Sequence, residues 1–162
     1  MKRTQAIELP EEEIAKQKEW MAAFAALEDR PHTYCVVTYG QMNAHDSEKL
    51  EGMLTQMGMT PAANREEADF VIFNTCCVRD NAQRRALGNV VWLKELKKTR
   101  PELMVGVCGC MMQQEHIIKR LKSKYSWVDI IFGTMSIQDF PQLLADCLSK
   151  REKVMSVYKN QE

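Results

Sequence analysis

The sequence predicts an α/β fold, a three-layer sandwich with a mainly parallel sheet and an N-terminal helical extension. Short apolar runs rich in β-branched and aromatic residues alternate with amphipathic helical segments from Thr33 onward. Such alternation is typical of a parallel sheet that helices cover on both faces. The chain has 162 residues, of which 45% are hydrophobic, enough to bury the core of one domain.

The segment before the first strand predicts a helix over residues 10–29. Pro10 suits a first helical turn, and the glutamates that follow it favour the positive end of the helix dipole. Ile14, Met21 and Phe24 then recur at helical spacing. We expect residues 1–31 to form a helical extension that is an appendage to the core.

The order of the remaining elements predicts a Rossmann-like domain over residues 32–150. The expected strands cover residues 33–39, 69–75, 103–107 and 128–132. A helix is expected from Asp46 to Met57 with Gly58 as its left-handed cap, and a long helix ends before Pro101. Two further helices carry the apolar residues Ile117, Ile118 and Leu121, and Leu143, Leu144 and Leu148, the last helix opening with a capping box at Ser136. Residues 151–162 are expected to be a linker.

Charge and composition narrow the functional classes only slightly. Lysine plus arginine and aspartate plus glutamate both total 22, but residues 79–124 carry eleven basic and four acidic side chains, which is compatible with an RNA-facing patch. The N-terminus has neither the apolar core of a signal peptide nor a membrane span. We therefore expect a cytoplasmic protein without a membrane partner, whose six cysteines are reduced.

The chemistry should lie at the carboxyl ends of the strands, where ligands bind in open parallel sheets. Cys76 and Cys77 follow the second expected strand, and Cys108 and Cys110 lie at the end of the third. Free cysteine is often only a small buried hydrophobe. At a helix N-terminus near cations, however, a thiolate is stabilised, and sulfur ligands without nearby histidines favour iron-sulfur chemistry over zinc.

Three segments at these strand ends resemble the signature segments of the methylthiotransferase N-terminal domain. They are TYGQMNAHDSE from Thr38 to Glu48, NTCCVR from Asn74 to Arg79, and GCMMQ from Gly109 to Gln113. Their content is most similar to that of the tRNA 2-methylthio-adenosine synthases of the MiaB type. The resemblance covers about residues 32–150 in the family's order.

The resemblance implies an auxiliary 4Fe-4S cluster to which each segment contributes one cysteine. It assigns metal-ligand roles to Cys76 and Cys110, whereas no residue is assigned a catalytic role. Asn74 and Thr75 can order the loop beside a ligand, and Gly109 can let the backbone approach a cluster. The residues expected around the cluster are Gly40, Gln41, Asn43, Asn74, Thr75, Gly109 and Gln113. Asp46, Ser47 and Glu48 could also line the site, but they are interpreted as the start of a helix.

The first segment departs from the family pattern. The family has a cysteine between the glycine and the glutamine, whereas Gly40 is followed directly by Gln41 here. This one-residue deletion either removes a ligand or reflects a residue omitted from the determined sequence. Cys35 lies about 17 Å along an extended strand from Gly40, too far for a simple replacement. Cys147, on the apolar face of the last helix, is expected to be structural.

The family's activity implies a transferase that inserts a methylthio group at carbon 2 of N6-isopentenyladenosine beside the tRNA anticodon. Its implied partners are that tRNA, a sulfur donor, and the radical and RNA-binding domains of the same full-length chain. The radical domain uses S-adenosylmethionine and a second 4Fe-4S cluster held by a Cys-x-x-x-Cys-x-x-Cys motif, which does not occur in this sequence. We therefore expect a fragment that is inactive alone.

The rival interpretation is a non-catalytic doubly wound binding module, flavodoxin-like or regulatory, that has lost its metal site. It predicts a colourless protein whose stability does not depend on iron. A dinucleotide-binding dehydrogenase domain is disfavoured because no GxGxxG follows the first strand.

Overall fold

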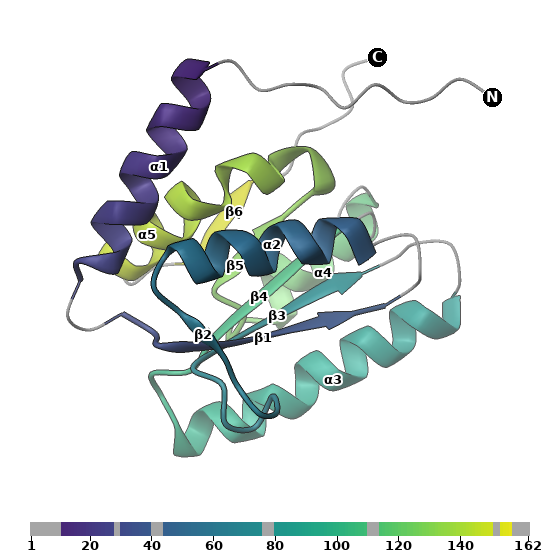
Figure 1. Ribbon diagram of the computed structural model, residues 1–162. Coiled ribbons are helices and arrows are strands. Elements are labelled where there is room, and N and C mark those ends of the chain that lie inside the picture. Colours follow the sequence, from purple (N-terminus) through teal and green to yellow (C-terminus); the bar gives the residue numbers. More distant parts are fainter. Residues whose placement is uncertain are drawn as a thin grey trace, which may run out of the picture.

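A parallel sheet forms the centre of the computed structural model, which describes residues 11–27, 30–39, 44–75, 80–109, 114–150 and 153–156 (Figure 1). Its strands lie in the order β2-β1-β3-β4-β5-β6, and every neighbouring pair is parallel. The strands are β1 (Thr33–Thr38), β2 (Thr60–Pro61), β3 (Phe70–Thr75), β4 (Met104–Gly109), β5 (Ile130–Phe132) and β6 (Val154–Ser156). All residues of β3 and β4 are buried, which explains why these central strands are continuous apolar runs.

Helices cover both faces of the sheet, so the predicted three-layer α/β fold is confirmed. The helices are α1 (Glu11–Ala25), α2 (Ala44–Gln56), α3 (Asp80–Thr99), α4 (Glu115–Lys124) and α5 (Phe140–Lys150). Alternate residues of β3 divide the core: Phe70 packs in one cluster with residues of α1, α2 and α5, and Phe73 in another with residues of α3 and α4. Figure 1 shows α2 and α3 on opposite sides of β1 and β3.

The N-terminal helix expected from the sequence is present, and it packs into the core of the domain. It ends at Ala25, earlier than predicted, and packs against α5. Phe24 is 0% exposed and Met21 is 5% exposed, and both belong to the core cluster on this face of the sheet. Since these two side chains lie three residues apart on one face of the helix, burying that face requires contact with the domain.

The start of the last helix also differs from the prediction. Ser136 lies within a 3-10 helix, η3 (Thr134–Asp139), and α5 begins only at Phe140. Pro141 explains the later start, because a residue without an N–H is best accommodated in the first turn of an α-helix. The predicted cap at the end of α2 is confirmed: Gly58 has φ +87°, and the N–H of Met59 donates to the carbonyl of Leu54.

Two short strands were not predicted, and β6 lies where a linker was expected. Lys153, directly before β6, donates to the carbonyls of Leu121 (2.7 Å) and Tyr125 (2.9 Å) at the end of α4. Burial lowers the pKa of Lys153, and the nearby Asp129 carboxylate opposes this shift. The ammonium thus satisfies carbonyls that α4 cannot bond internally and attaches the C-terminal segment to the domain.

No helix in the described part of the chain combines the length and the apolar character that crossing a lipid bilayer requires.

Candidate functional site at the switch point of the sheet

The chain reverses its direction of travel across the sheet between β1 and β3. From β1 it passes through α2 to β2 on one side, whereas from β3 it passes through α3 to β4 on the other. Crevices at the carboxyl ends of the strands at such a switch point bind ligands in open α/β sheets. In the register Thr38 pairs with Asn74, and Asn74 pairs with Cys108. The ends of three neighbouring strands therefore meet at this edge.

The described part of the predicted cluster site lies at this edge. Asn74 and Thr75 end β3, and Gly109 ends β4 directly beside Thr75. The two predicted metal ligands, Cys76 and Cys110, follow Thr75 and Gly109 in the sequence but lie outside the described residues. The same holds for Gly40, Gln41, Asn43 and Gln113. The structure thus places the starting points of two cysteine-bearing segments next to each other, and the ligand roles themselves stay predictions.

A buried polar network lies beneath these strand ends. The hydroxyl of Ser47, in the first part of α2, is 2.6 Å from that of Thr38 and accepts a hydrogen bond from the Asn74 amide at 3.0 Å. The Cys108 thiol donates to the Asn74 carbonyl oxygen, with a sulfur–oxygen distance of 3.9 Å. Asn74 is 1% exposed and Ser47 6%. The network connects α2 to the ends of β1, β3 and β4.

Ser47 was weighed from the sequence as a residue that could line the site, but the interpretation preferred for it was the first turn of a helix. The spacing of Ser47 from two leucines of the same helix indicates that its side chain faces the core. Ser47, Leu50 and Leu54 lie three and seven residues apart, so they share one helix face, and the two leucines are fully buried. A serine on the buried face of a helix must find a hydrogen-bond partner, and Asn74 provides it.

Gly109 fits this edge because two strands approach closely there. It has φ +107°, a conformation that side chains rarely adopt. A Cβ at this position would overlap the backbone oxygen and nitrogen of Thr75 and lie 2.9 Å from the Asn74 side-chain oxygen. The Thr75 hydroxyl donates to the carbonyl of Cys108 at 2.7 Å. The described neighbours of Gly109 are therefore β3 atoms, and an approach to a cluster stays a prediction.

An open cavity lies beside the same edge on the α3 side. It has a volume of about 510 Å³ and is lined by Thr38, Tyr39, Arg85, Gly88 and Asn89. Tyr39 is buried and stacks on Phe73, with ring centroids 6.2 Å apart. Its hydroxyl accepts a hydrogen bond from the Asn89 amide. Thr38 and Tyr39 begin the first signature segment, whereas no motif indicated Gly88 and Asn89, because only the fold brings the end of β1 against α3.

The described cysteines away from the strand ends have other surroundings. Cys147 is buried, and its thiol donates to the Asp129 carbonyl at 3.5 Å, so its predicted structural role is confirmed. Cys35 is half-buried in the middle of β1, where it packs against the core on the α3 side. Within the described residues, no three histidine, cysteine, aspartate or glutamate side chains are grouped to hold a metal ion.

Cys35 is expected to react slowly with iodoacetamide at neutral pH. Burial raises the pKa of its thiol; the Arg65 guanidinium lowers it and the Glu51 carboxylate raises it. Because the thiolate is the nucleophile, the alkylation rate should rise with pH up to a pKa above the ordinary cysteine value. Arg65→Gln should slow alkylation at a given pH, and Glu51→Gln should accelerate it. Peptide mapping by mass spectrometry measures both, and equal rates in the two variants would contradict the assignment.

The fold and this edge define a doubly wound parallel α/β domain with a polar site at its switch point. The chain belongs to the family described as "Uncharacterized protein family UPF0004", whose model matches residues 33–133. This match, together with the names of similar curated proteins, confirms the family resemblance found in the sequence.

Three of these relatives carry the name tRNA-2-methylthio-N(6)-dimethylallyladenosine synthase. The one from Thermoanaerobacter sp. (strain X514) is 46% identical over 156 residues, which are 95% of this chain and 33% of the relative. That from Caldicellulosiruptor saccharolyticus is 50% identical over 131 residues, 80% of this chain and 28% of the relative. That from Acetivibrio thermocellus is 43% identical over 155 residues, 91% of this chain and 32% of the relative. The chain thus spans about a third of the length of these relatives.

Proposed function

We propose that this chain is the auxiliary 4Fe-4S cluster-binding domain of a cytoplasmic tRNA methylthiotransferase. The full-length enzyme would insert a methylthio group at carbon 2 of N6-isopentenyladenosine next to the anticodon. The observation that carries the proposal is the pairing of Thr75 with Gly109, because each directly precedes a cysteine of a family signature segment. The names of relatives that are 43–50% identical support the same activity.

The described strand ends support two of the cluster's proposed ligand positions. Neighbouring strands are about 4.8 Å apart, so Thr75 and Gly109 end at adjacent points of the sheet. Each directly precedes a proposed ligand in the sequence, Cys76 or Cys110, which supports a cluster bound by both. The N-terminus of α3 begins at Asp80, four residues after Cys76, and its dipole favours a thiolate nearby. The third position lacks its cysteine between Gly40 and Gln41, so this sequence provides two of the three family thiolates.

The chain's own residues would hold and position the cofactor. Cys76 and Cys110 would bind iron through their thiolates, and the Ser47–Asn74 hydrogen bond would hold the end of β3 in register with α2. When bound, the cluster supplies an iron with an open coordination position for the sulfur to be inserted. S-adenosylmethionine, a second 4Fe-4S cluster and a sulfur donor would act with the radical and RNA-binding parts of the full-length protein. We expect this chain alone to lack complete activity.

Iron loading should depend on Cys76 and Cys110 and should be independent of Cys35. After anaerobic reconstitution, a chain with a cluster should contain about four irons and a similar amount of sulfide. Cys76→Ser and Cys110→Ser should each reduce iron binding severely, because each removes a thiolate. Cys35→Ser is the matched control and should load like the unaltered chain, since Cys35 lies in the middle of β1. Iron and sulfide assays with the visible absorption spectrum measure the result.

Intact mass distinguishes the two explanations of the first segment. A mass higher by one cysteine residue, with a stable cluster, would restore the family's three-ligand site. A mass that matches the sequence, with no cluster under reconstitution, would refute the proposal for this chain. It would favour the non-catalytic doubly wound module, which the departure at Gly40 and Gln41 makes the second candidate.

A further inference from the structure

We use the term groove for a surface that begins at a cavity by the switch point, between β1 and α3, and continues along one face of α3 as far as Trp92. Its first part is the cavity that Thr38, Tyr39, Arg85, Gly88 and Asn89 line. β2 pairs with β1 only at Thr33 and Tyr34, so the described part of the chain adds no further strand beside the carboxyl half of β1. Cys35 and Val37, on the same side of β1 as Tyr39, are only partly buried. The floor of the groove is therefore accessible.

One face of α3 forms the wall of this groove. Arg85, Gly88, Asn89 and Trp92 lie three, four and seven residues apart, which places them on one helix face. Arg85 and Trp92 are separated by about 10 Å along the axis at about 1.5 Å per residue. An added Cβ at Gly88 would meet nothing within 4 Å, so the middle of the wall is open.

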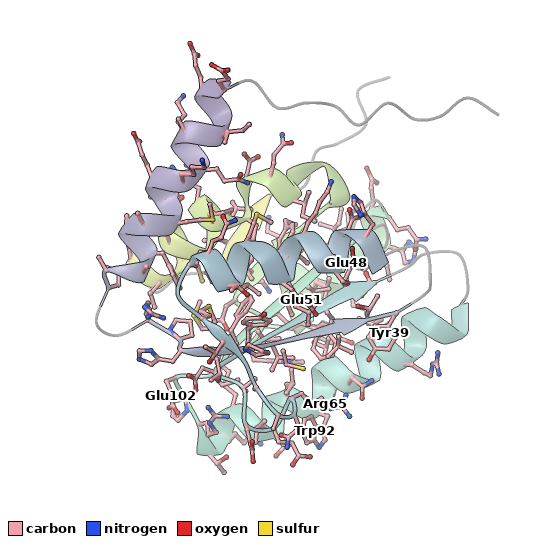
Figure 2. The ribbon with its side chains drawn as sticks, viewed as in Figure 1. Tyr39, Glu48, Glu51, Arg65, Trp92 and Glu102 are labelled. Atoms are coloured by element: carbon pink, nitrogen blue, oxygen red, sulfur yellow. The ribbon has the colours of Figure 1, made fainter. Side chains whose placement is uncertain are left out.

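The far end of the groove has a stacked cation and aromatic ring. The guanidinium of Arg65 lies over the indole of Trp92 at 5.1 Å from the ring centroid, and Trp92 is 38% exposed although it is large and apolar. The segment that carries Arg65 also borders β1, because the N–H of Ala62, three residues earlier, donates to the carbonyl of Tyr34 at 2.9 Å. Figure 2 shows Tyr39 toward one end of α3 and Arg65 beside Trp92 farther along it.

The charges of the two rims differ. No described acidic side chain forms an ion pair with Arg65 or Arg85, so both guanidinium groups remain available on the α3 side. On the α2 side, Glu48 and Glu51 are exposed. Figure 2 labels both side chains on α2. An anionic, partly flat ligand would thus place its charges along α3 and its apolar faces against Trp92 and the floor.

We infer that this groove binds a short stretch of single-stranded RNA, with a base stacked on the Arg65–Trp92 pair and phosphates at Arg65 and Arg85. Unpaired bases stack on aromatic rings and guanidinium planes, and basic side chains along a groove follow the backbone. The inference rests on the proposed function, and it names where nucleotides near the modified base would lie. A duplex cannot use the stacking platform because its bases are already paired and stacked.

Fluorescence anisotropy of a short labelled single-stranded RNA, titrated with the full chain, tests this inference. Trp92→Ala should raise the Kd about fivefold to hundredfold, whereas Trp92→Phe should retain most of the affinity because it keeps an aromatic face. The Arg65→Gln/Arg85→Gln double variant should lower the slope of log K against log salt by about 1.4. Glu51→Gln should tighten binding. Lys18→Gln, an exposed charge on α1, is the matched control and should bind like the unaltered chain.

Several results would overturn the inference. These are undetectable RNA binding by the unaltered chain, unchanged binding in both the Trp92→Ala and double-arginine variants, or equally strong competition by duplex RNA. Binding of an extended apolar peptide in place of RNA would assign the open edge of β1 to a protein partner instead. The iron content of the same samples separates the two proposals. If iron loading is normal and the variants do not change RNA binding, only the groove is refuted. If iron loading is absent, the cluster-binding function is refuted.

Discussion

Gly109→Ala should unfold the domain or leave it close to unfolding. A side chain at φ +107° costs about 1–3 kcal/mol in backbone strain alone. The added Cβ would also overlap backbone atoms of Thr75, which cannot rotate away as a side chain end can. Relief requires separating the ends of β3 and β4, where the Thr75 hydroxyl bonds the Cys108 carbonyl. The total should exceed about 4 kcal/mol, a large part of the 5–15 kcal/mol that stabilises an ordinary domain.

Gly52→Ala is the matched control for this substitution. Gly52 lies within α2, and a Cβ there would meet nothing within 4 Å. The same chemical change should therefore stabilise the protein by about 0.5–1 kcal/mol, because alanine has the better helix propensity. Urea unfolding followed by circular dichroism measures both variants. A Gly109→Ala chain as stable as the original would show that β3 and β4 do not approach as closely as described.

Substitution of Gly109 would also affect the proposed cluster site. Gly109 directly precedes Cys110 in the sequence. A glycine at this position allows the ends of β3 and β4 to approach closely, whether or not a cluster is bound. Cluster loss in a Gly109 variant would consequently report on the fold as well as on the cofactor, and only the cysteine variants test the ligands directly.

The order of strands and helices was predictable because the spacing of apolar residues in the sequence reflects which side chains each element buries. The run from Phe70 to Thr75 is buried on both faces, and its composition shows this directly. The three segments that resemble the family's signatures also indicated which edge of the sheet carries the site. Asn74, Thr75 and Gly109 were selected from the sequence for their positions next to cysteines, and the structure places them together at that edge.

Features that depend on contacts between distant segments could not be predicted. The strand of Thr60 and Pro61 has only two residues and gains its identity by pairing with Thr33 and Tyr34. β6 depends on its pairing with β5 and on Lys153, whose ammonium bonds carbonyls of α4 about thirty residues earlier. The groove between β1 and α3 likewise depends on the pairing of β3 with β1, which brings α3 beside β1. Local propensity contains none of this information.

The hydrogen bond between Ser47 and Asn74 should appear as a coupling energy. Asn74→Leu removes a donor and an acceptor from a residue that is 1% exposed, and it leaves Ser47 and the Cys108 thiol without this partner. We expect a loss of about 3 kcal/mol, since the cost of unsatisfied buried polar groups adds to that of the lost bonds. Ser47→Ala should cost less, about 1–2 kcal/mol, because it removes the buried hydroxyl that accepts a hydrogen bond from the Asn74 amide.

The double variant tells whether these residues act together. Replacing both partners by apolar groups removes the orphaned polar atoms, so its cost should fall below the sum of the single losses by about 1 kcal/mol. Additive losses would show that the two side chains stabilise the fold separately. Thr38 also bonds Ser47, so the coupling joins the ends of β1 and β3 through α2. If the proposed cluster binds at these ends, Ser47→Ala should reduce iron loading more than a surface substitution of equal cost in stability, because the two strand ends would no longer be fixed relative to each other.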